Sequence, residues 1–278
     1  MSPPLFSIII PTYNAGRTLS RCLESILKQT DTDIEVIIQD GGSTDDTAQI
    51  AEGFDTDRIH FFAEPDNGIY DAMNKAIERS TGTWLLFLGS DDYLYGPAVL
   101  ADIRKALTGT TAQLVYGNVK MVGDTPWAKD GAMYRGETSA AELMLHNYSH
   151  QATFYHRGIF DDGHRYNPKY RVCADYDFNL LCTAKYHVQY IPIVVSCFVS
   201  GGFSSINEDE LFIQDMWTNV IRYFGSKLRT NPFFPFRKNM KKAAEVFYKR
   251  FDLYHALVAL SLYLYHSSRK GRFSARHL

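Results

Sequence analysis

Two adjacent carboxylates, Asp91 and Asp92, follow a short apolar run at Trp84–Leu88. The run has the length of one buried strand, and Gly89 and Ser90 end it. Two carboxylates at the end of a buried strand repel each other and lose hydration unless a cation or a ligand balances their charge. Carboxylate oxygens suit Mg²⁺ and Mn²⁺, which in turn suit the phosphates of nucleotides. We therefore predict a divalent metal site at Asp91 and Asp92, against the alternative of a surface turn in which both acids are solvated.

Two further predicted strands end in polar residues that suit ligand binding. The apolar run at 6–10 is followed by Pro11, Thr12, Tyr13 and Asn14, and the run at 34–39 is followed by Asp40. Parallel strands place their carboxyl ends along one edge of a sheet, so we expect a nucleotide near Thr12 and Asp40, with its diphosphate at the metal. Taken alone, Asp40 is better explained as an Asx-turn cap before Gly41.

The elements that must position these residues alternate between strands and helices. Segments rich in apolar residues predict strands at residues 6–10, 34–39, 59–63, 84–88, 114–119 and 188–199. Helices are expected between the first four strands, with Asn14 capping the first helix and Ser43 or Thr44 the second, and again at Asp175–Lys185. This order predicts an α/β fold, with a mostly parallel central sheet flanked by helices. The sequence has neither a GxGxxG nor a P-loop motif.

The composition is that of an ordinary globular protein. The chain has 278 residues, of which 45% are hydrophobic and 22% charged. Its four cysteines lack metal-ligand spacing and are expected to be reduced core thiols in a cytosolic setting. We expect no signal peptide, because no basic region precedes an apolar one at the N-terminus. No apolar run reaches the ~18–20 residues of a spanning helix.

Charge is distributed unevenly along the chain. Residues 1–214 carry 16 Lys and Arg against 28 Asp and Glu, a net charge of −12. Residues 215–278 carry 13 Lys and Arg against 3 acids, a net charge of +10, and the two parts give the −2 of the whole chain. This split predicts an acidic catalytic body and a basic tail that binds phosphate. The acidic body argues against nucleic acid as a partner.

In the tail, basic residues alternate with large aromatic residues at helical spacing. The basic ones are Arg237, Lys238, Lys241, Lys242, Lys249 and Arg250, and the aromatic ones are Phe233, Phe234, Phe236, Phe247, Tyr248 and Phe251. This pattern favours an amphipathic helix on an anionic membrane surface, with Tyr254–Tyr265 dipping into the interface. The alternative is a helical pair that packs on the body and balances its acidic charge.

Five segments, in this order, resemble family 2 glycosyltransferases, which have the GT-A fold. They are SIIIPTYNAGRTLSRCLESILKQ, IEVIIQDGGSTDDT, PDNGIYDAMNKAI, WLLFLGSDDYL and HQATFY with CADYDFNL. The resemblance covers roughly residues 7–205 and implies a GT-A catalytic domain at 1–210 followed by a helical, basic C-terminal extension at 211–278.

The resemblance also implies roles for the residues at the strand ends. The residues matching Pro11, Thr12, Tyr13, Asn14 and Asp40 hold the nucleoside of an activated sugar, and those matching Ser90, Asp91 and Asp92 hold the donor and its Mn²⁺ or Mg²⁺. This chain has Gly89 where many members have the first acid of that motif.

The catalytic base of the family maps to Asp175. Many relatives carry Glu before that Asp, where this chain has Ala174, so Asp177 remains an alternative base. We favour Asp175, because Asp177 lies two residues further along a helix and points to a different side. Such an enzyme inverts the anomeric carbon in one displacement. The metal balances the leaving diphosphate, and the carboxylate takes the proton of the acceptor hydroxyl.

Four other residues are candidates for donor or acceptor contacts. His150 and Gln151 match a family segment near the donor phosphates or the acceptor, although a core or capping histidine explains His150 as well. Asp71 and Lys75 lie on a helix whose N-terminus faces the donor in this interpretation, against the alternative of a solvated face. The segment Gly201–Ser205 is interpreted either as a lid over bound substrate or as a turn.

The resemblance and the tail together predict the acceptor class. A peripheral cytoplasmic position on the inner face of the plasma membrane suits a glycan or lipid-linked acceptor used in surface polysaccharide synthesis. Gln214–Trp217 lacks the Arg of the QxxRW motif of processive synthases, which favours the addition of a single hexosyl or N-acetylhexosaminyl unit. The alternatives are a nucleotidyltransferase and a non-catalytic nucleotide-sugar-binding protein on the membrane surface.

Overall fold

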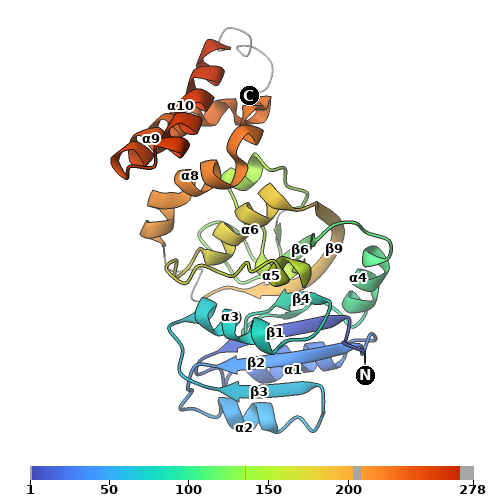
Figure 1. The fold of residues 1–278 in the computed structure, drawn as a ribbon. Coiled ribbons are helices and arrows are strands. Elements are labelled where there is room, and N and C mark those ends of the chain that lie inside the picture. The colour runs from blue at the N-terminus through green and yellow to red at the C-terminus, as the bar shows by residue number, and fades with distance from the viewer. Residues whose placement is uncertain (1, 135, 203–207, 270–278) are drawn as a thin grey trace.

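The computed structural model describes residues 2–134, 136–202 and 208–269 (Figure 1). Its strands form one sheet in the order β3-β2-β1-β4-β8-β6-β9-β5, and β7 pairs with β6. The strands are β1 Phe6–Thr12, β2 Ile34–Asp40, β3 Ile59–Ala63, β4 Trp84–Phe87, β5 Tyr93–Leu94, β6 Leu114–Val122, β7 Met133–Tyr134, β8 Thr153–His156 and β9 Val188–Val199.

The helices cover the sheet and then extend beyond it. The α-helices are α1 Leu19–Leu27, α2 Thr47–Glu52, α3 Ile69–Arg79, α4 Val99–Leu107, α5 Gly158–Asp161, α6 Ala174–Lys185, α8 Glu210–Phe224, α9 Arg237–Lys249 and α10 Leu253–Ser268. Short 3₁₀ helices lie at η1 Glu142–Met144, η2 His150–Ala152, η3 Gly225–Arg229 and η4 Asn231–Phe236. All six predicted strands and the predicted helices are present.

The sheet is parallel in one half and mixed in the other. Strands β3, β2, β1 and β4 are mutually parallel, which confirms the βαβ prediction. Strand β8 lies antiparallel between β4 and β6, and β9 pairs parallel with β6. Because β8 runs in the opposite direction, its first residues lie at the edge where β4 ends. The residues before β8 are thereby brought to the predicted nucleotide edge.

The two predicted helix caps are wrong. Thr18 precedes α1, whereas Asn14 adopts a left-handed conformation with φ of 50° and accepts a hydrogen bond from Thr44 N at 3.0 Å. Asp46 precedes α2, and the hydroxyl of Ser43 donates to Asp40 Oδ1 at 2.5 Å. These polar side chains connect the loops after β1 and β2, so tertiary contacts have taken the groups that local capping would use.

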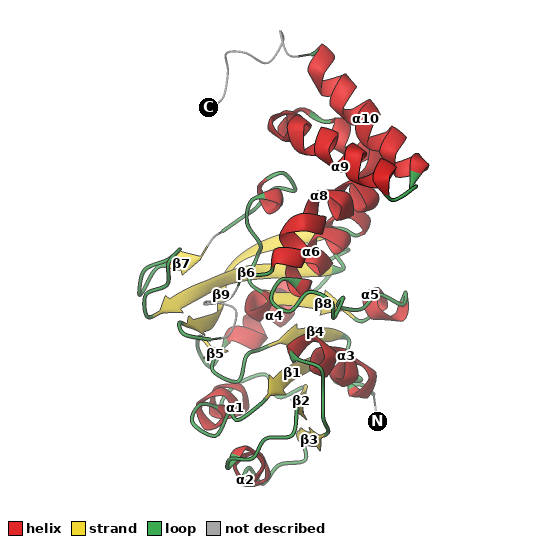
Figure 2. Ribbon diagram, turned by 90° about the vertical axis from the view of Figure 1, so that its left-hand side faces the viewer, coloured by secondary structure: helices red, strands yellow, loops and turns green. Residues whose placement is uncertain are grey.

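The two faces of the sheet bury different apolar residues. Ile9 and Phe87 belong to the cluster covered by α3 and α6, while Ile8 and Leu86 belong to the cluster covered by α1 and α4. Figure 2 shows α1 and α3 on opposite sides of β1. Since successive strand residues alternate between faces, continuous apolar runs are the pattern that a sheet buried on both sides requires.

The C-terminal helices share a core with the sheet domain. The cluster that contains Phe87 continues through α8 to Phe233, Phe247 of α9 and Leu262 of α10. Figure 1 shows α9 and α10 at the end of the molecule away from β3 and α2. Of the six predicted interfacial aromatics, Phe233 and Phe247 are therefore buried in the core, whereas Tyr248 and Phe251 are exposed. Within the described residues, no helix has the length and hydropathy needed to cross a membrane.

Helix α10 nevertheless leaves one apolar face exposed. Its buried residues are Ala256, Ala259, Leu262 and His266. Its exposed leucines are Leu253, Leu257, Leu260 and Leu264. The 4-3-4 spacing of these leucines aligns them along the helix face opposite to the buried one, and we call them the leucine stripe.

Candidate active site

The ends of β1 and β2 meet as predicted and are connected through Asp40. Thr12 pairs with Asp40 in the sheet, and its hydroxyl donates to Asp40 Oδ1 at 3.1 Å. The other carboxylate oxygen accepts hydrogen bonds from the backbone N–H groups of Gly42 at 2.9 Å and Ser43 at 2.8 Å. The Asx-turn alternative is therefore present in the structure. Asp40 shapes the turn after β2, and a contact of this buried carboxylate with a nucleoside remains a prediction.

The segment after β1 follows the same edge. Pro11 and Thr12 are buried in β1, while Tyr13 is 68% exposed. The backbone N–H of Asn14 donates to Ser43 Oγ at 2.7 Å, so the loops after β1 and β2 form one rigid rim. An exposed aromatic ring on such a rim offers a stacking surface beside the strand ends.

The acidic motif forms a turn directly after β4. The backbone N–H of Asp92 donates to Gly89 O at 3.0 Å and closes the turn around Ser90 and Asp91. The side chain of Asp92 is buried, and each of its oxygens has a protein donor. Val199 N donates to Oδ1 at 2.8 Å, and Gln151 Nε2 donates to Oδ2 at 2.9 Å.

The two carboxylates of the motif converge on one place. A Cβ atom added to Gly89 would lie 2.7 Å from Asp91 Oδ1 and 2.9 Å from Asp92 Oδ2, and one added to Gly202 would lie 2.7 Å from Asp91 Oδ2. Burial, followed by the charge of Asp91, raises the pKa of Asp92 to about 7. Within the described residues there is no cluster of three or more His, Cys, Asp or Glu side chains able to hold a metal. The paired carboxylates fit a hard divalent cation whose other ligands come from elsewhere, such as phosphate oxygens and water.

Asp175 lies in the first turn of α6 at the end of a polar network. Its carboxylate accepts hydrogen bonds from Tyr70 Oη at 2.9 Å and Asn147 Nδ2 at 2.8 Å, and it lies 3.4 Å from His150 Nδ1. The residue is 8% exposed and borders a cavity of about 180 Å³. Asp175 is therefore held in one orientation at a cavity wall, the arrangement that a general base needs.

Asp177 faces a different part of the molecule. Its carboxylate accepts hydrogen bonds from Asn219 Nδ2 at 2.8 Å and from Tyr223 Oη at 3.0 Å, both on α8. Burial raises its pKa to about 6, although the hydrogen bonds from Tyr223 and Asn219 act against this rise. Asp177 thus connects α6 to the C-terminal helices and does not line the cavity at Asp175.

His150 and Gln151 occupy the 3₁₀ turn η2 between the two acidic sites. Gln151 contacts Asp92, and His150 contacts Asp175. Burial alone would lower the pKa of His150, but the hydrogen bond and charge of Asp175, together with the charges of Asp92 and Asp91, raise it above its usual value. Each residue thus contacts one of the predicted acidic residues, and a contact of either with donor or acceptor remains a prediction.

The remaining candidates have local partners. Asp71 accepts a hydrogen bond from the backbone N–H of Asn67 at 2.9 Å, and Lys75 Nζ donates to Pro65 O at 2.7 Å and lies 3.6 Å from Asp71. These contacts shape the start of α3, so a contact with substrate remains a prediction. Residues 203–205 of the proposed lid lie outside the described residues.

Aromatic and polar side chains line the cavity at Asp175. The sequence did not predict several of these lining residues, because only the fold brings them together. The lining residues that were not predicted are Tyr70, Asn147, Tyr148, Trp127, Tyr134 and Phe198. Asn147 precedes β8, a strand too short for its apolar pattern to be recognised, and Trp127 lies in a stretch without clear periodicity. A polar residue shortly before the HQATFY segment was the available clue to Asn147.

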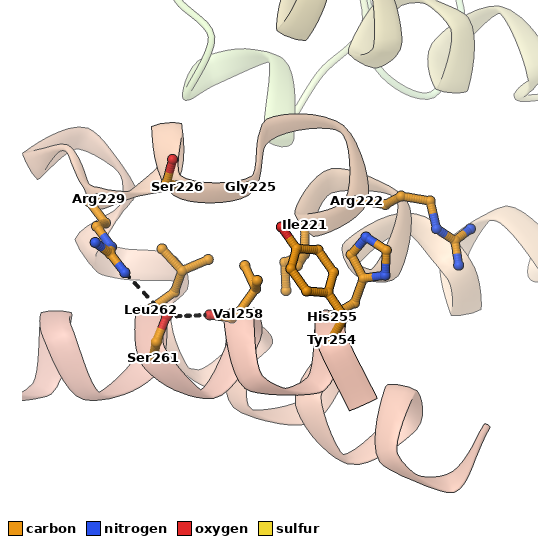
Figure 3. A pocket seen from close by; sticks show the side chains of 10 residues that line it. All are labelled: Ile221, Arg222, Gly225, Ser226, Arg229, Tyr254, His255, Val258, Ser261 and Leu262. Carbon is orange, nitrogen blue, oxygen red and sulfur yellow. Dashed lines mark hydrogen bonds between the residues drawn. The ribbon is translucent and has the colours of Figure 1, made fainter. Parts of the chain in front are cut away.

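A second cavity, of about 160 Å³, lies between α8, η3 and α10 (Figure 3). Arg222 and Arg229 lie at its two ends, and Ile221, Val258 and Leu262 provide apolar lining. None of the predicted catalytic or donor-binding residues lines it. The cavity is lined by His255 but by none of the predicted acidic residues, so the site at Asp175 is the better match to the predicted chemistry.

Comparison with known proteins shows which family the sequence resembles. Residues 7–166 match the family model described as glycosyl transferase family 2. A PGL/p-HBAD biosynthesis glycosyltransferase of Mycobacterium tuberculosis is 41% identical over 222 residues, which cover 77% of this chain and 84% of that protein. A chondroitin synthase of Escherichia coli is 39% identical over 151 residues, which cover 52% of this chain and 22% of that larger protein.

Solved structures share the fold at low sequence identity. Residues 1–349 of TarS from S. aureus, in complex with UDP-GlcNAc, align with a TM-score of 0.64 at 17% identity, covering 99% of this chain and 93% of that one. The mannosyltransferase PcManGT from Pyrobaculum calidifontis, in complex with GDP-Man and Mn²⁺, aligns with a TM-score of 0.58 at 16% identity, covering 100% and 77%. The chain therefore has the GT-A glycosyltransferase fold.

Proposed function

Since the chain belongs to glycosyl transferase family 2, we propose that it transfers one sugar from a nucleoside diphosphate to an acceptor hydroxyl and inverts the anomeric configuration. Membership of this family favours glycosyl transfer over the nucleotidyltransferase and binding-protein alternatives. The single observation that carries the proposal is the separation of two acidic sites by one turn. Within η2, Gln151 contacts Asp92 of the acidic motif, and the adjacent His150 contacts Asp175.

The donor is assigned to the edge formed by the ends of β1, β2 and β4. The rim built by Pro11, Thr12, Tyr13 and Asn14 would hold the nucleoside, with Asp40 fixing the turn beside it. Ser90 and Asp91 would face the diphosphate. Similar solved structures bind UDP-GlcNAc and GDP-Man, so a nucleotide sugar is the donor class that we propose for this chain.

Asp91 and Asp92 would hold the divalent metal, Mn²⁺ or Mg²⁺. Both oxygens of Asp92 already accept hydrogen bonds, so we assign the more exposed Asp91 as the main ligand and Asp92 as its support. When bound, such a cation supplies positive charge beside the diphosphate leaving group. The raised pKa of Asp92 supports this assignment, because a nearby cation would favour its ionised form.

Asp175 is assigned as the general base. The acceptor hydroxyl would enter the cavity and lose its proton to Asp175 as its oxygen bonds to the anomeric carbon, while the bond from that carbon to the diphosphate breaks. Tyr70 and Asn147 hold the carboxylate in place for this step. One displacement from the face opposite to the leaving group inverts the configuration, so no covalent nucleophile is needed.

We further propose that the acceptor is a glycan or a lipid-linked glycan at an anionic membrane surface. The leucine stripe of α10 and the exposed side chains of Lys238, Lys241, Lys242 and Lys249 support this, because an exposed apolar row beside cations suits a lipid interface. The named relatives act in PGL/p-HBAD biosynthesis and as a chondroitin synthase. The sugar would be a hexosyl or N-acetylhexosaminyl unit added once, in surface polysaccharide or glycolipid synthesis on the cytoplasmic side.

The direct test measures nucleoside diphosphate release. The purified protein is incubated with UDP-, GDP- and dTDP-sugars, with Mn²⁺ or Mg²⁺, and with or without glycan acceptors. We expect release from one donor class that stops when EDTA removes the metal, and NMR of the product should show an inverted anomeric centre. Absence of release from every donor would contradict glycosyl transfer, and a retained configuration would contradict the single displacement.

A further inference from the structure

Trp127 stands on a loop that is rigidly built. The loop joins β6 to β7, and Asp124 and Asp130 hold its two sides together. Asp130 N donates to Asp124 Oδ1 at 2.9 Å, and Gly123 N donates to Asp130 Oδ1 at 2.8 Å. A tight turn, closed by a 2.8 Å hydrogen bond from Thr125 N to Ala128 O, then carries Trp127 at its tip. These hydrogen bonds hold the backbone of the loop that carries Trp127.

The indole contacts two other aromatic rings and is still half exposed. Its ring lies 5.1 Å from the ring of Tyr134 and 5.6 Å from that of Phe198, measured between centroids. Trp127 is nevertheless 49% exposed, and it lines the same cavity as Asp175. A large aromatic ring that contacts neighbouring rings, is half exposed and lines a cavity is a suitable stacking surface.

A chain of contacts connects this aromatic surface to Asp175. Trp127 packs against Tyr134, and Tyr134 Oη donates to Asn147 O at 3.3 Å. The side chain of Asn147 in turn donates to Asp175 Oδ2 at 2.8 Å. The indole and the carboxylate thus belong to one connected wall of the cavity, so a ligand that stacks on Trp127 has a defined position relative to Asp175.

We propose that Trp127 forms an acceptor subsite that binds a sugar ring through its C–H face. This inference rests on the proposed function and names the substrate class of the acceptor side. A pyranose has a flat apolar face and a rim of hydroxyls. The indole covers the apolar face, while Asn147, Tyr148 and His150 on the same cavity wall offer polar groups to the hydroxyls. Stacking would present one acceptor hydroxyl to Asp175.

The cavity also explains why this subsite is for the acceptor. Its lining includes Asp175 and Gln151, but the residues that we assign to the donor, such as Asp91, Asp40 and Thr12, are not part of it. Loss of the indole should therefore weaken acceptor binding and leave donor binding unchanged. A residue with a merely structural role would affect both.

The test compares Trp127→Ala and Trp127→Phe with Tyr95→Ala, using a panel of methyl glycosides as acceptors. Tyr95 is also 49% exposed but does not line the cavity, so it is a matched control. We expect Trp127→Ala to raise the acceptor KM at least tenfold, while donor KM and acceptor-independent donor hydrolysis stay within twofold of wild type. Trp127→Phe should recover most of the loss, and Tyr95→Ala should behave as wild type.

Intrinsic fluorescence gives a second measurement that does not depend on turnover. Methyl glycosides should quench the emission of the wild-type protein, and Trp127→Phe should abolish that quenching while Trp84 and Trp217 still emit. An unchanged acceptor KM in Trp127→Ala would overturn the subsite, and so would a panel that neither accepts sugar nor quenches fluorescence. Failure of the proposed function is distinguishable, because wild-type protein would then hydrolyse no nucleotide sugar at all.

Discussion

The side-chain amide of Gln151 donates a hydrogen bond to Asp92 Oδ2 at 2.9 Å. The preceding residue, His150, lies 3.4 Å from Asp175 through its Nδ1 atom. One short turn therefore contacts the proposed metal motif with one residue and the proposed base with the next. Because the two residues are adjacent in the chain, this turn connects the two acidic sites directly.

The first prediction concerns the manganese requirement and follows from the contact between Gln151 and Asp92. Gln151→Leu leaves Asp92 Oδ2 buried without this donor, so the ionised carboxylate becomes less favourable and its support of the metal weaker. We expect the Mn²⁺ concentration for half-maximal activity to rise by about 10–100-fold. A manganese titration of nucleoside diphosphate release measures this. Gln189→Leu is the control, because Gln189 bonds Thr110 instead. An unchanged manganese requirement would show that Gln151 does not support the metal motif.

A second prediction separates the two acids of α6. Asp175→Asn removes the proposed proton acceptor but keeps the size of the side chain, so transfer should fall by about 10²–10⁴-fold. Donor binding, measured by calorimetry, should stay within about threefold of wild type, since Asp175 lies on the acceptor side of η2. Asp177→Asn is the matched control and should retain transfer. The base assignment is wrong if the two variants exchange these behaviours.

The third prediction concerns stability and pH. Burial raises the pKa of Asp177 to about 6, from 3.8 for an ordinary aspartate. Between these values the folded protein binds a proton that the unfolded chain has lost, so the free energy of unfolding falls as pH rises from about 4 to about 6. The loss is about 3 kcal/mol. Asp177→Asn does not titrate, so its fall in stability with pH should be shallower than that of the wild type, and the fall that remains comes from groups such as Asp92, whose pKa is also raised. Chemical denaturation at pH 4.5 and pH 7.5 checks it, and an equally steep fall in the variant would contradict it.

A fourth prediction tests the membrane proposal at the leucine stripe. Leu257→Glu and Leu264→Glu place charges on an exposed face, so they should leave folding intact while stopping the protein from floating with vesicles that contain anionic lipid. Truncation is a poorer test, because α9 and α10 bury Phe247 and Leu262 in the shared core.

The control for this experiment is Leu145→Glu, an exposed leucine outside the C-terminal helices, which should float as wild type does. If the Leu257→Glu and Leu264→Glu variants both still float with the vesicles, the membrane proposal is contradicted. Sedimentation of the same variants addresses the other occupant of a 4-3-4 leucine row, a second copy of this chain. If the wild-type protein is a dimer that does not float, and the stripe variants are monomers, the stripe is a self-association surface.

The parallel half of the fold was predictable because its information is local. Runs such as Phe6–Ile10 are apolar at every position except Ser7, a pattern typical of a strand buried on both faces, and the intervening helices have their own periodicity. The short strands β5 and β8 and the helix α4 were missed. A two-residue or four-residue strand has too few positions to show alternation, so its pairing depends on neighbours that are distant in sequence.

The candidate site divides in the same way. The chain sequence determined which chemical groups are present, because Asp91 and Asp92 follow a buried strand and Asp175 opens a helix. Only the tertiary structure decided how they are used. In the folded chain, Asp175 lines a cavity and Asp177 contacts α8. Asn14 and Ser43 connect two loops and do not cap the helices for which they were predicted. Local sequence fixes side-chain type and backbone preference, whereas orientation and partners depend on contacts between distant segments. The position of η2 between the acids follows from one such contact, the antiparallel pairing of β8 with β4.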